Sequence, residues 1–354
     1  MPLLKTNLPG MPQAFMPPLQ QLRDMATFDA ALADPIVAHG ATIRFDHSVT
    51  KPIDVHADLL SMLTGGSKVS KLRPTVSVNA QYRGKGAVLA LLDSGVSRHK
   101  ALKGKVISTL RSDGSDEAKP DLLGHGTHLA GIVVADDLDG EAAMSGIAPE
   151  ARVISLRVTE DDYATAPIWR ITEGLATVLH LHKTLPADER PTAVLISFNA
   201  TDNVSKPIGV GHHRLAQLVQ ECRNRHIPVI CSAGNMYEQH GERPGLAYPA
   251  YIPGIIAVAA TVDRAGAEGK LTSFTQRIHP EKSHLPICYT LAPGAKTLST
   301  GIASDTAYSF LSGSSQAAAV TAATILLLQS AYAAQHHGAL PGVEYFTDLL
   351  PKTI

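Results

Sequence analysis

The sequence predicts an α/β domain with a mostly parallel central sheet, and two patterns support this fold class. Five short runs are almost entirely apolar, as expected of parallel strands that are covered on both faces. These runs are Ala87–Leu92, Val153–Val158, Ala193–Phe198, Val229–Ser232 and Ile255–Ala260. Helical segments alternate with them, which is the order expected when helices connect the strands of a parallel sheet.

Two of the intervening segments, His212–His226 and Trp169–Leu185, have the apolar spacing of helices with one buried face. The residues on those faces are Leu215, Leu218, Val219 and Cys222 in the first, and Leu175, Val178 and Leu179 in the second. A third segment, Ala317–Leu328, is apolar almost throughout. It is shorter than the roughly 20 residues that cross a bilayer, so we expect a buried helix and no membrane span.

The composition is that of an ordinary soluble domain. The chain has 354 residues, of which 44% are hydrophobic and 18% are charged, and its formal net charge is −1. Such a balance gives no indication of a nucleic-acid or membrane surface. Three widely spaced cysteines form no disulfide framework, and prolines interrupt the N-terminus where a signal peptide would be apolar. We therefore expect a cytoplasmic protein.

Four polar positions follow buried strands or open a helix, where α/β proteins gather their chemistry. They are Asp93 at the end of a strand, His125 between two glycines, Asn235 after another strand, and Ser315 at the start of the apolar helix. Each alone has a structural interpretation as a turn, cap or core residue. His128, three residues after His125, is expected to be structural, because no acid-rich pattern supports a metal pair.

Their order in the chain is what indicates a function. The Asp, His, Ser order is that of the subtilisin triad among the convergent serine-hydrolase sites. On these residues the chain resembles the subtilisin-like (S8) serine peptidases, over roughly residues 80–335. Further stretches similar to family landmarks follow in order: Tyr82–Gly86, Gly146–Pro149, Tyr248–Ala250, Ala257–Ala260, Leu271–Phe274 and Ala292–Gly294.

The resemblance implies a three-layer subtilisin-like fold and a serine endopeptidase that acts on a peptide or protein substrate. Ser315 would be the nucleophile, His125 the base and Asp93 the group that orients it, while Asn235 and the Ser315 amide would stabilise the oxyanion. The chemistry would require no cofactor. The resemblance also implies an N-terminal extension or propeptide-like segment over residues 1–75, a catalytic domain over 76–340 and a C-terminal tail over 341–354.

Several positions depart from the family pattern. Gln316 and Ala319 replace the usual Met and Pro after the serine, where we expect them to support the helix. The usual Ser-Leu-Gly-Gly strand reads Ser197-Phe198-Asn199-Ala200. By resemblance, Phe198 and Asn199 would form the walls of the pocket for the residue before the scissile bond, and Ala247 would form its floor. These side chains predict a narrow pocket. In the segment expected to pair with the substrate, Asp161 and Asp162 predict a preference for basic residues.

Alternatives remain open at this point. The same acyl-enzyme could be resolved by an amine, which would make the protein a peptide ligase or macrocyclase. A catalytically inactive peptide-binding module is a third possibility. The acidic run from Asp136 to Glu141 could hold a structural calcium ion, although solvated surface charge is the simpler interpretation.

Overall fold

The computed structural model describes residues 82–136, 145–159, 166–206, 213–262, 270–278, 285 and 287–350. The expected extension over residues 1–75 lies outside the described residues. So do Asp161, Asp162 and every carboxylate of the acidic run except that of Asp136.

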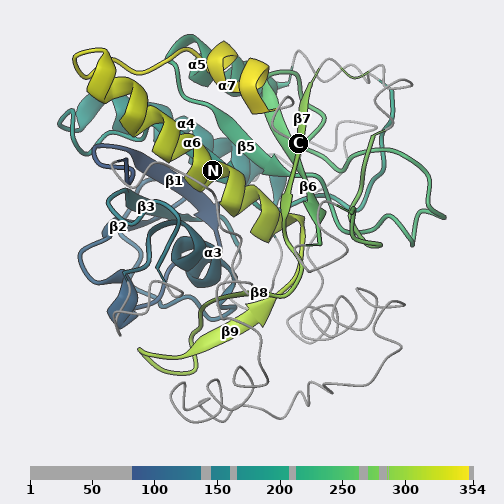
Figure 1. Cartoon of the computed structure of the whole chain (residues 1–354), viewed down its shortest axis with the longest axis horizontal. Coiled ribbons are helices and arrows are strands. Elements are labelled where there is room, and N and C mark those ends of the chain that lie inside the picture. Colours follow the sequence, from purple (N-terminus) through teal and green to yellow (C-terminus); the bar gives the residue numbers. More distant parts are fainter. Residues whose placement is uncertain are drawn as a thin grey trace, which may run out of the picture.

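A seven-stranded sheet forms the centre of the described domain (Figure 1), in the order β2-β3-β1-β4-β5-β6-β7. All neighbouring pairs are parallel. The strands are β1 (Val88–Asp93), β2 (Val106–Arg111), β3 (Arg152–Arg157), β4 (Ala193–Ile196), β5 (Val229–Ser232), β6 (Ile255–Thr261) and β7 (Cys288–Pro293). The five predicted strands are confirmed, with small shifts at their ends.

Strands β2 and β7 were missed because they are the two edges of the sheet. Most of their residues are only half-buried, whereas β1, β4, β5 and β6 are buried throughout. A half-buried edge strand needs no continuous apolar run, so the pattern used to find the central strands does not detect it.

Helices cover both faces of the sheet, which confirms the three-layer α/β architecture (Figure 1). One face carries α3 (His125–Val134) and α6 (Ser314–Gln335), and the other carries α4 (Ile168–Thr184) and α5 (Arg214–Asn224). Side chains of β1 alternate between the two cores: Leu89 and Leu91 face the α3–α6 layer, and Val88, Ala90 and Leu92 face the α4–α5 layer.

Helix α6 is long and apolar enough to cross a membrane by length and composition. Most of its apolar stretch is buried inside the domain. In this fold it therefore serves as a core helix, as predicted for Ala317–Leu328.

Two smaller elements complete the domain. An antiparallel hairpin of β8 (Thr297–Thr300) and β9 (Tyr308–Leu311) packs beside α3. The segment expected to be a C-terminal tail contains a helix, α7 (Val343–Leu349), whose Phe346 is fully buried in the α3–α6 core. Residues 341–350 are thus packed against the domain.

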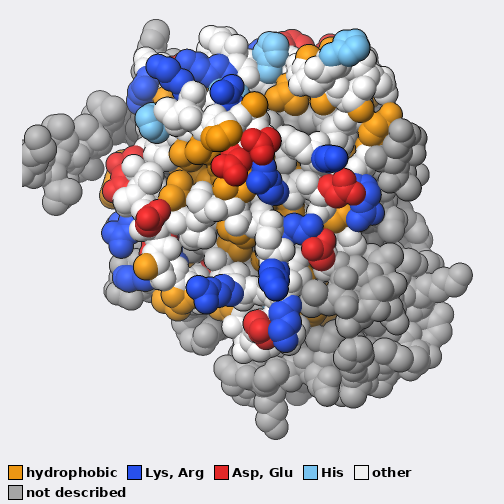
Figure 2. Space-filling model, turned by 90° about the vertical axis from the view of Figure 1, so that its left-hand side faces the viewer, with side chains coloured by type: hydrophobic (Ala, Val, Ile, Leu, Met, Phe, Trp, Pro, Cys, Tyr) orange, Lys and Arg blue, Asp and Glu red, His pale blue; other side chains and the backbone are white. Residues whose placement is uncertain are grey.

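The surface view gives no sign of strong charge separation. Acidic and basic side chains are interspersed on the face shown in Figure 2. This mixed pattern agrees with the formal net charge of −1 for the whole chain.

The sheet topology brings the predicted site residues to the end of the sheet where the carboxyl ends of the strands lie. Strand β1 has β3 on one side and β4 on the other, so the order of strands reverses around it. In such sheets the carboxyl ends beside the reversal form a crevice. Asp93 is the last residue of β1, Ser197 follows β4, and Asn235 comes three residues after β5.

Candidate active site

Asp93 and His125 form a hydrogen-bonded pair at the carboxyl end of β1. The His125 Nδ1 atom lies 2.8 Å from Asp93 Oδ1 and 3.1 Å from Oδ2. The aspartate is fully buried, and its Oδ1 also accepts a bond of 2.7 Å from the Ser94 amide. Because a carboxylate can only accept, Nδ1 carries the proton in the neutral ring and Nε2 is left as an acceptor.

The loop before α3 is held by Asp121, which the sequence reasoning missed. Its Oδ1 accepts from the amides of Leu123 and Gly124, and its Oδ2 accepts from the amide and hydroxyl of Thr127. A buried Asp that binds four donors fixes the turn from which His125 projects. An Asp three residues before the Gly124-His125-Gly126 stretch was the available signal, as Asp side chains often bond the amides at helix starts.

The glycines on either side of His125 have a steric explanation. Gly124 has a φ of 76°, in the left-handed region that favours glycine. A Cβ atom on Gly126 would lie 2.1 Å from the Gly95 carbonyl oxygen and 3.0 Å from Asp93 Oδ1. Only a glycine there lets α3 approach β1 closely enough for the Asp93–His125 contact.

The pKa of His125 reflects two opposing effects. Burial disfavours the charged imidazolium and lowers the pKa, whereas the charge and hydrogen bond of Asp93, with the charge of Asp121, raise it. The net result is a pKa above the ordinary value of 6.5. The carboxylate therefore stabilises the protonated ring, as a base that must carry a proton during a reaction requires.

Ser315 lies beside the residues that follow β4, which His125 also contacts. It is the second residue of α6, and its Oγ donates to the Ser197 carbonyl oxygen at 3.3 Å. The His125 ring packs edge-on against Phe198, with 5.8 Å between ring centroids. Ser315 and His125 thus contact consecutive residues of one short segment.

Asn235 lies against the start of α6. Its Oδ1 accepts from the Ser314 amide at 2.8 Å. A Cβ atom placed on Gly313 would lie 3.2 Å from Asn235 Nδ2 and 3.7 Å from the Ser315 amide nitrogen. The nitrogens of Asn235 and Ser315 thus border the same position, and Gln316 Oε1 also borders it, at 2.9 Å.

Three of the residues predicted to form a substrate pocket, Phe198, Asn199 and Ala247, lie near the ends of β4 and β5. Asn199 accepts a bond of 2.5 Å from Ser232 Oγ and donates one of 2.8 Å to the Ser232 carbonyl. Its side chain therefore spans the gap between the two strand ends. Phe198 and Ala247 are fully buried, and the Ala247 Cβ would lie 2.8 Å from a Cβ on Gly234.

Other candidate groups have structural partners. His128 Nε2 lies 3.0 Å from the Thr297 oxygen and 3.1 Å from the Ser309 oxygen, so the ring ties α3 to the β8–β9 hairpin. Asp136 forms an ion pair of 2.8 Å with Lys105. Among the described residues, no group of three His, Cys, Asp or Glu side chains could hold a metal ion.

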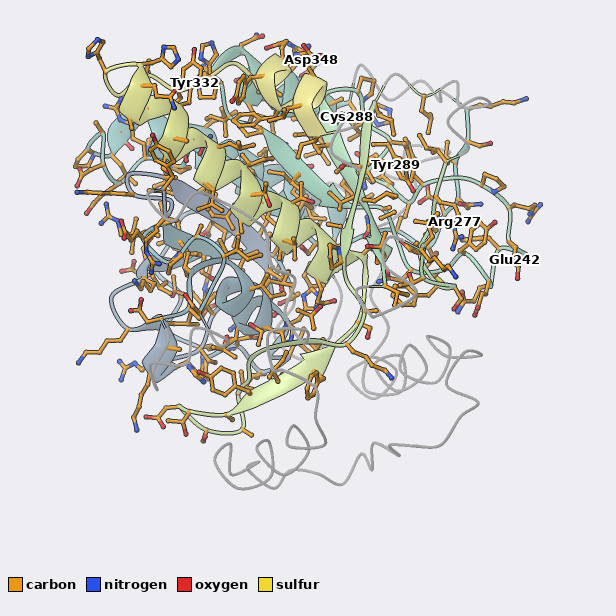
Figure 3. All side chains as sticks on the ribbon, in the orientation of Figure 1. Glu242, Arg277, Cys288, Tyr289, Tyr332 and Asp348 are labelled. Carbon is orange, nitrogen blue, oxygen red and sulfur yellow. The ribbon has the colours of Figure 1, made fainter. Side chains whose placement is uncertain are left out.

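The three free cysteines are poor candidates for a nucleophile. Burial raises the pKa of Cys222 and Cys231 to about 12 and that of Cys288 to about 11. Figure 3 shows Cys288 beside α7, at the end of β7 that is distant from the start of α6. Because the thiolate is the reactive form, these thiols are inert near neutral pH.

Comparison with known proteins places the chain in a class. The subtilase family profile, peptidase S8, matches residues 84–343. The major intracellular serine protease of Bacillus subtilis (strain 168) is 25% identical over 277 residues, which cover 77% of each chain. Fold and relatives together define a subtilisin-like serine protease, a hydrolase. The chain belongs to the subtilase family, which confirms the resemblance found in the sequence.

Solved structures agree at the level of the fold. Sphericase superposes with a TM-score of 0.61 at 20% identity, covering 80% of this chain and 88% of that chain. The protease domain of PatA superposes with a TM-score of 0.58 at 20% identity, covering 76% and 88%. At such identities the similarity establishes the architecture alone.

Proposed function

We propose that this protein is a serine endopeptidase that uses Ser315 as nucleophile, His125 as general base and Asp93 as the orienting acid. The observation that carries the proposal is the 2.8 Å Asp93–His125 hydrogen bond beside the start of α6. It holds the imidazole in the tautomer that can accept a proton at Nε2.

In the proposed acylation step, Ser315 Oγ attacks the scissile carbonyl carbon and its proton passes to His125 Nε2. The π electrons of the carbonyl move to its oxygen, which Asn235 Nδ2 and the Ser315 amide stabilise. The C–N bond then breaks, and the leaving nitrogen takes the proton from His125. Water, activated by the same imidazole, hydrolyses the acyl-enzyme and regenerates Ser315.

The surroundings of the two adjacent serines favour Ser315 over Ser314 as the nucleophile. Ser314 is fully buried, and its Oγ accepts from the Gly234 amide at 3.2 Å, which ties α6 to the loop after β5. Ser315 Oγ instead has a long bond to a backbone oxygen, from which it can rotate. Its amide also lies in the positive field at the N-terminus of α6.

We also propose that the protein acts inside the cell. The B. subtilis relative is named an intracellular protease. The three free cysteines described above suit a reducing compartment.

The rate should depend on pH through His125. Only the neutral ring can accept the serine proton, so kcat/KM should rise as pH increases through the raised pKa, with a midpoint above 6.5. In Asp93→Asn the stabilising charge is removed, so the midpoint of the residual activity should move to lower pH. A pH profile of kcat/KM for both proteins tests this, and a midpoint that is unchanged in Asp93→Asn would contradict it.

The primary pocket should prefer small or medium residues before the scissile bond. The Asn199 side chain bonds Ser232 at the ends of β4 and β5, where the pocket is proposed to lie, and overpacking a tight site costs about 1–3 kcal/mol, or roughly 5- to 150-fold. Peptides that differ only in Ala, Leu or Phe at this position should show the lowest kcat/KM for Phe. Asn199→Gly should improve the Phe peptide most. Faster cleavage at Phe by the unaltered protein would refute the pocket assignment.

A direct test of the function combines a fluorophosphonate probe with digestion of a peptide library, both read by mass spectrometry. The probe should label Ser315, and the library should yield hydrolysed peptides. Products joined by a new amide bond would identify a ligase instead. If the full chain neither reacts with the probe nor cleaves peptides, a peptide-binding role replaces the proposal.

A further inference from the structure

Gln316, the residue after the proposed nucleophile, has a buried amide nitrogen that lacks a partner. Only 1% of the residue is exposed. Among the described residues, none forms a hydrogen bond with its Nε2 atom. Leaving a buried N–H donor unpaired is costly, so the missing partner calls for an explanation, and a catalytic role is one such explanation.

The carboxamide oxygen of Gln316 borders the same position as the two proposed oxyanion donors. A Cβ atom placed on Gly313 would lie 2.9 Å from Gln316 Oε1, 3.2 Å from Asn235 Nδ2 and 3.7 Å from the Ser315 amide nitrogen. Three polar groups thus surround one small space. Two of them offer N–H groups, and the third offers one after a half-turn of its amide.

That half-turn is physically accessible. The terminal torsion of a Gln side chain is broad and roughly two-fold, so the oxygen and the nitrogen can exchange places without moving the rest of the side chain. With Oε1 towards the space, a developing oxyanion would be repelled. With Nε2 towards it, the same negative charge would accept a third hydrogen bond and the nitrogen would gain its partner.

We propose that Gln316 is a third oxyanion donor, a catalytic residue that turns its Nε2–H group towards the carbonyl oxygen as negative charge develops there. The proposal rests on the proposed function, since it concerns the same acylation step. The proposed role of Gln316 changes none of the covalent bonds formed or broken in that step. This role differs from the support of the helix expected for Gln316 from the sequence. The usual family residue, Met, offers no such donor.

The test compares Gln316→Met, which keeps the length of the side chain and removes its N–H groups, with the unaltered full-length protein. The expected result is a fall in kcat of about 10- to 100-fold at nearly constant KM, since two donors remain and one contributes about 10²–10³-fold. The rate constant for covalent labelling by a fluorophosphonate, whose tetrahedral adduct fills the same space, should fall in proportion. Thermal stability should change little.

A matched control is available on the same helix. Gln329 is also buried, but it bonds Thr192 through both ends of its amide. Gln329→Met should lower thermal stability and leave the labelling rate constant unchanged. An equal loss of labelling in both variants would overturn the proposal, because the effect would then come from burying a methionine in α6.

Further outcomes separate this proposal from the proposed function. If the unaltered protein is labelled at Ser315 and Gln316→Met reacts as fast or faster, the third donor is refuted and the proposed function stands. A rise in KM with unchanged kcat would refute it in the same way. If the unaltered protein is not labelled at all, the third donor and the proposed function are both refuted. Should Gln316→Met not fold, Gln316→Leu provides the same comparison.

Discussion

Ser315→Ala is expected to abolish peptide cleavage while leaving the fold intact. The loss in kcat should be about 10⁶-fold, the magnitude found when the nucleophile of subtilisin is removed. The hydroxyl has one described hydrogen bond, of 3.3 Å to the Ser197 carbonyl, so its removal leaves no strong donor or acceptor unpaired. Single-turnover and steady-state assays measure the rate, and circular dichroism confirms that the variant is folded.

The neighbouring serine is the control for this prediction. Ser314→Ala removes a buried acceptor that binds the Gly234 amide, and a loss of this kind costs about 1–3 kcal/mol of stability. It removes no atom that forms a bond in the proposed reaction. We therefore expect a lower melting temperature and a far smaller loss of kcat. Equal losses in the two variants would show that the nucleophile has been misassigned.

Asn235→Ala should lower kcat by roughly 10²–10³-fold at nearly constant KM. The reason is that Nδ2 faces the point beside Gly313 where the oxyanion would form, and the oxyanion exists only in the transition state and the intermediate. Steady-state kinetics separate the two constants. A change confined to KM would indicate that Asn235 binds the substrate in its ground state.

A second variant separates the two ends of the Asn235 amide. Its Oδ1 accepts from the Ser314 amide, so Asn235→Ala also loses a structural bond at the start of α6. Asn235→Asp keeps an acceptor for that amide and loses the donor. It should therefore lose at least as much kcat as Asn235→Ala and retain more stability. Normal turnover in Asn235→Asp would exclude a role for the donor.

The central strands and the order of the proposed site residues could be predicted from the sequence. A strand buried on both faces must be apolar along its whole length, and polar groups then stand out where it ends, as Asp93 does after Leu92. The edge strands β2 and β7 could not be found in this way, since most of their residues are only half-buried and need not be apolar. Helix α7 was also missed, although Phe346 is fully buried.

The details of the site were decided by tertiary structure. Asp121 supports the loop before α3, Asn199 bonds Ser232 across two strands, and Gln316 shares one small space with Asn235. The last two contacts join residues 33 and 81 positions apart, and their existence depends on strand register and on the closeness of the backbones at Gly313. By itself, the sequence determined which residues could perform the chemistry, because residue type and local periodicity are properties of short segments. The tertiary structure alone decided which of these residues lie close together, because the sheet brings segments that are distant in the sequence to the same site.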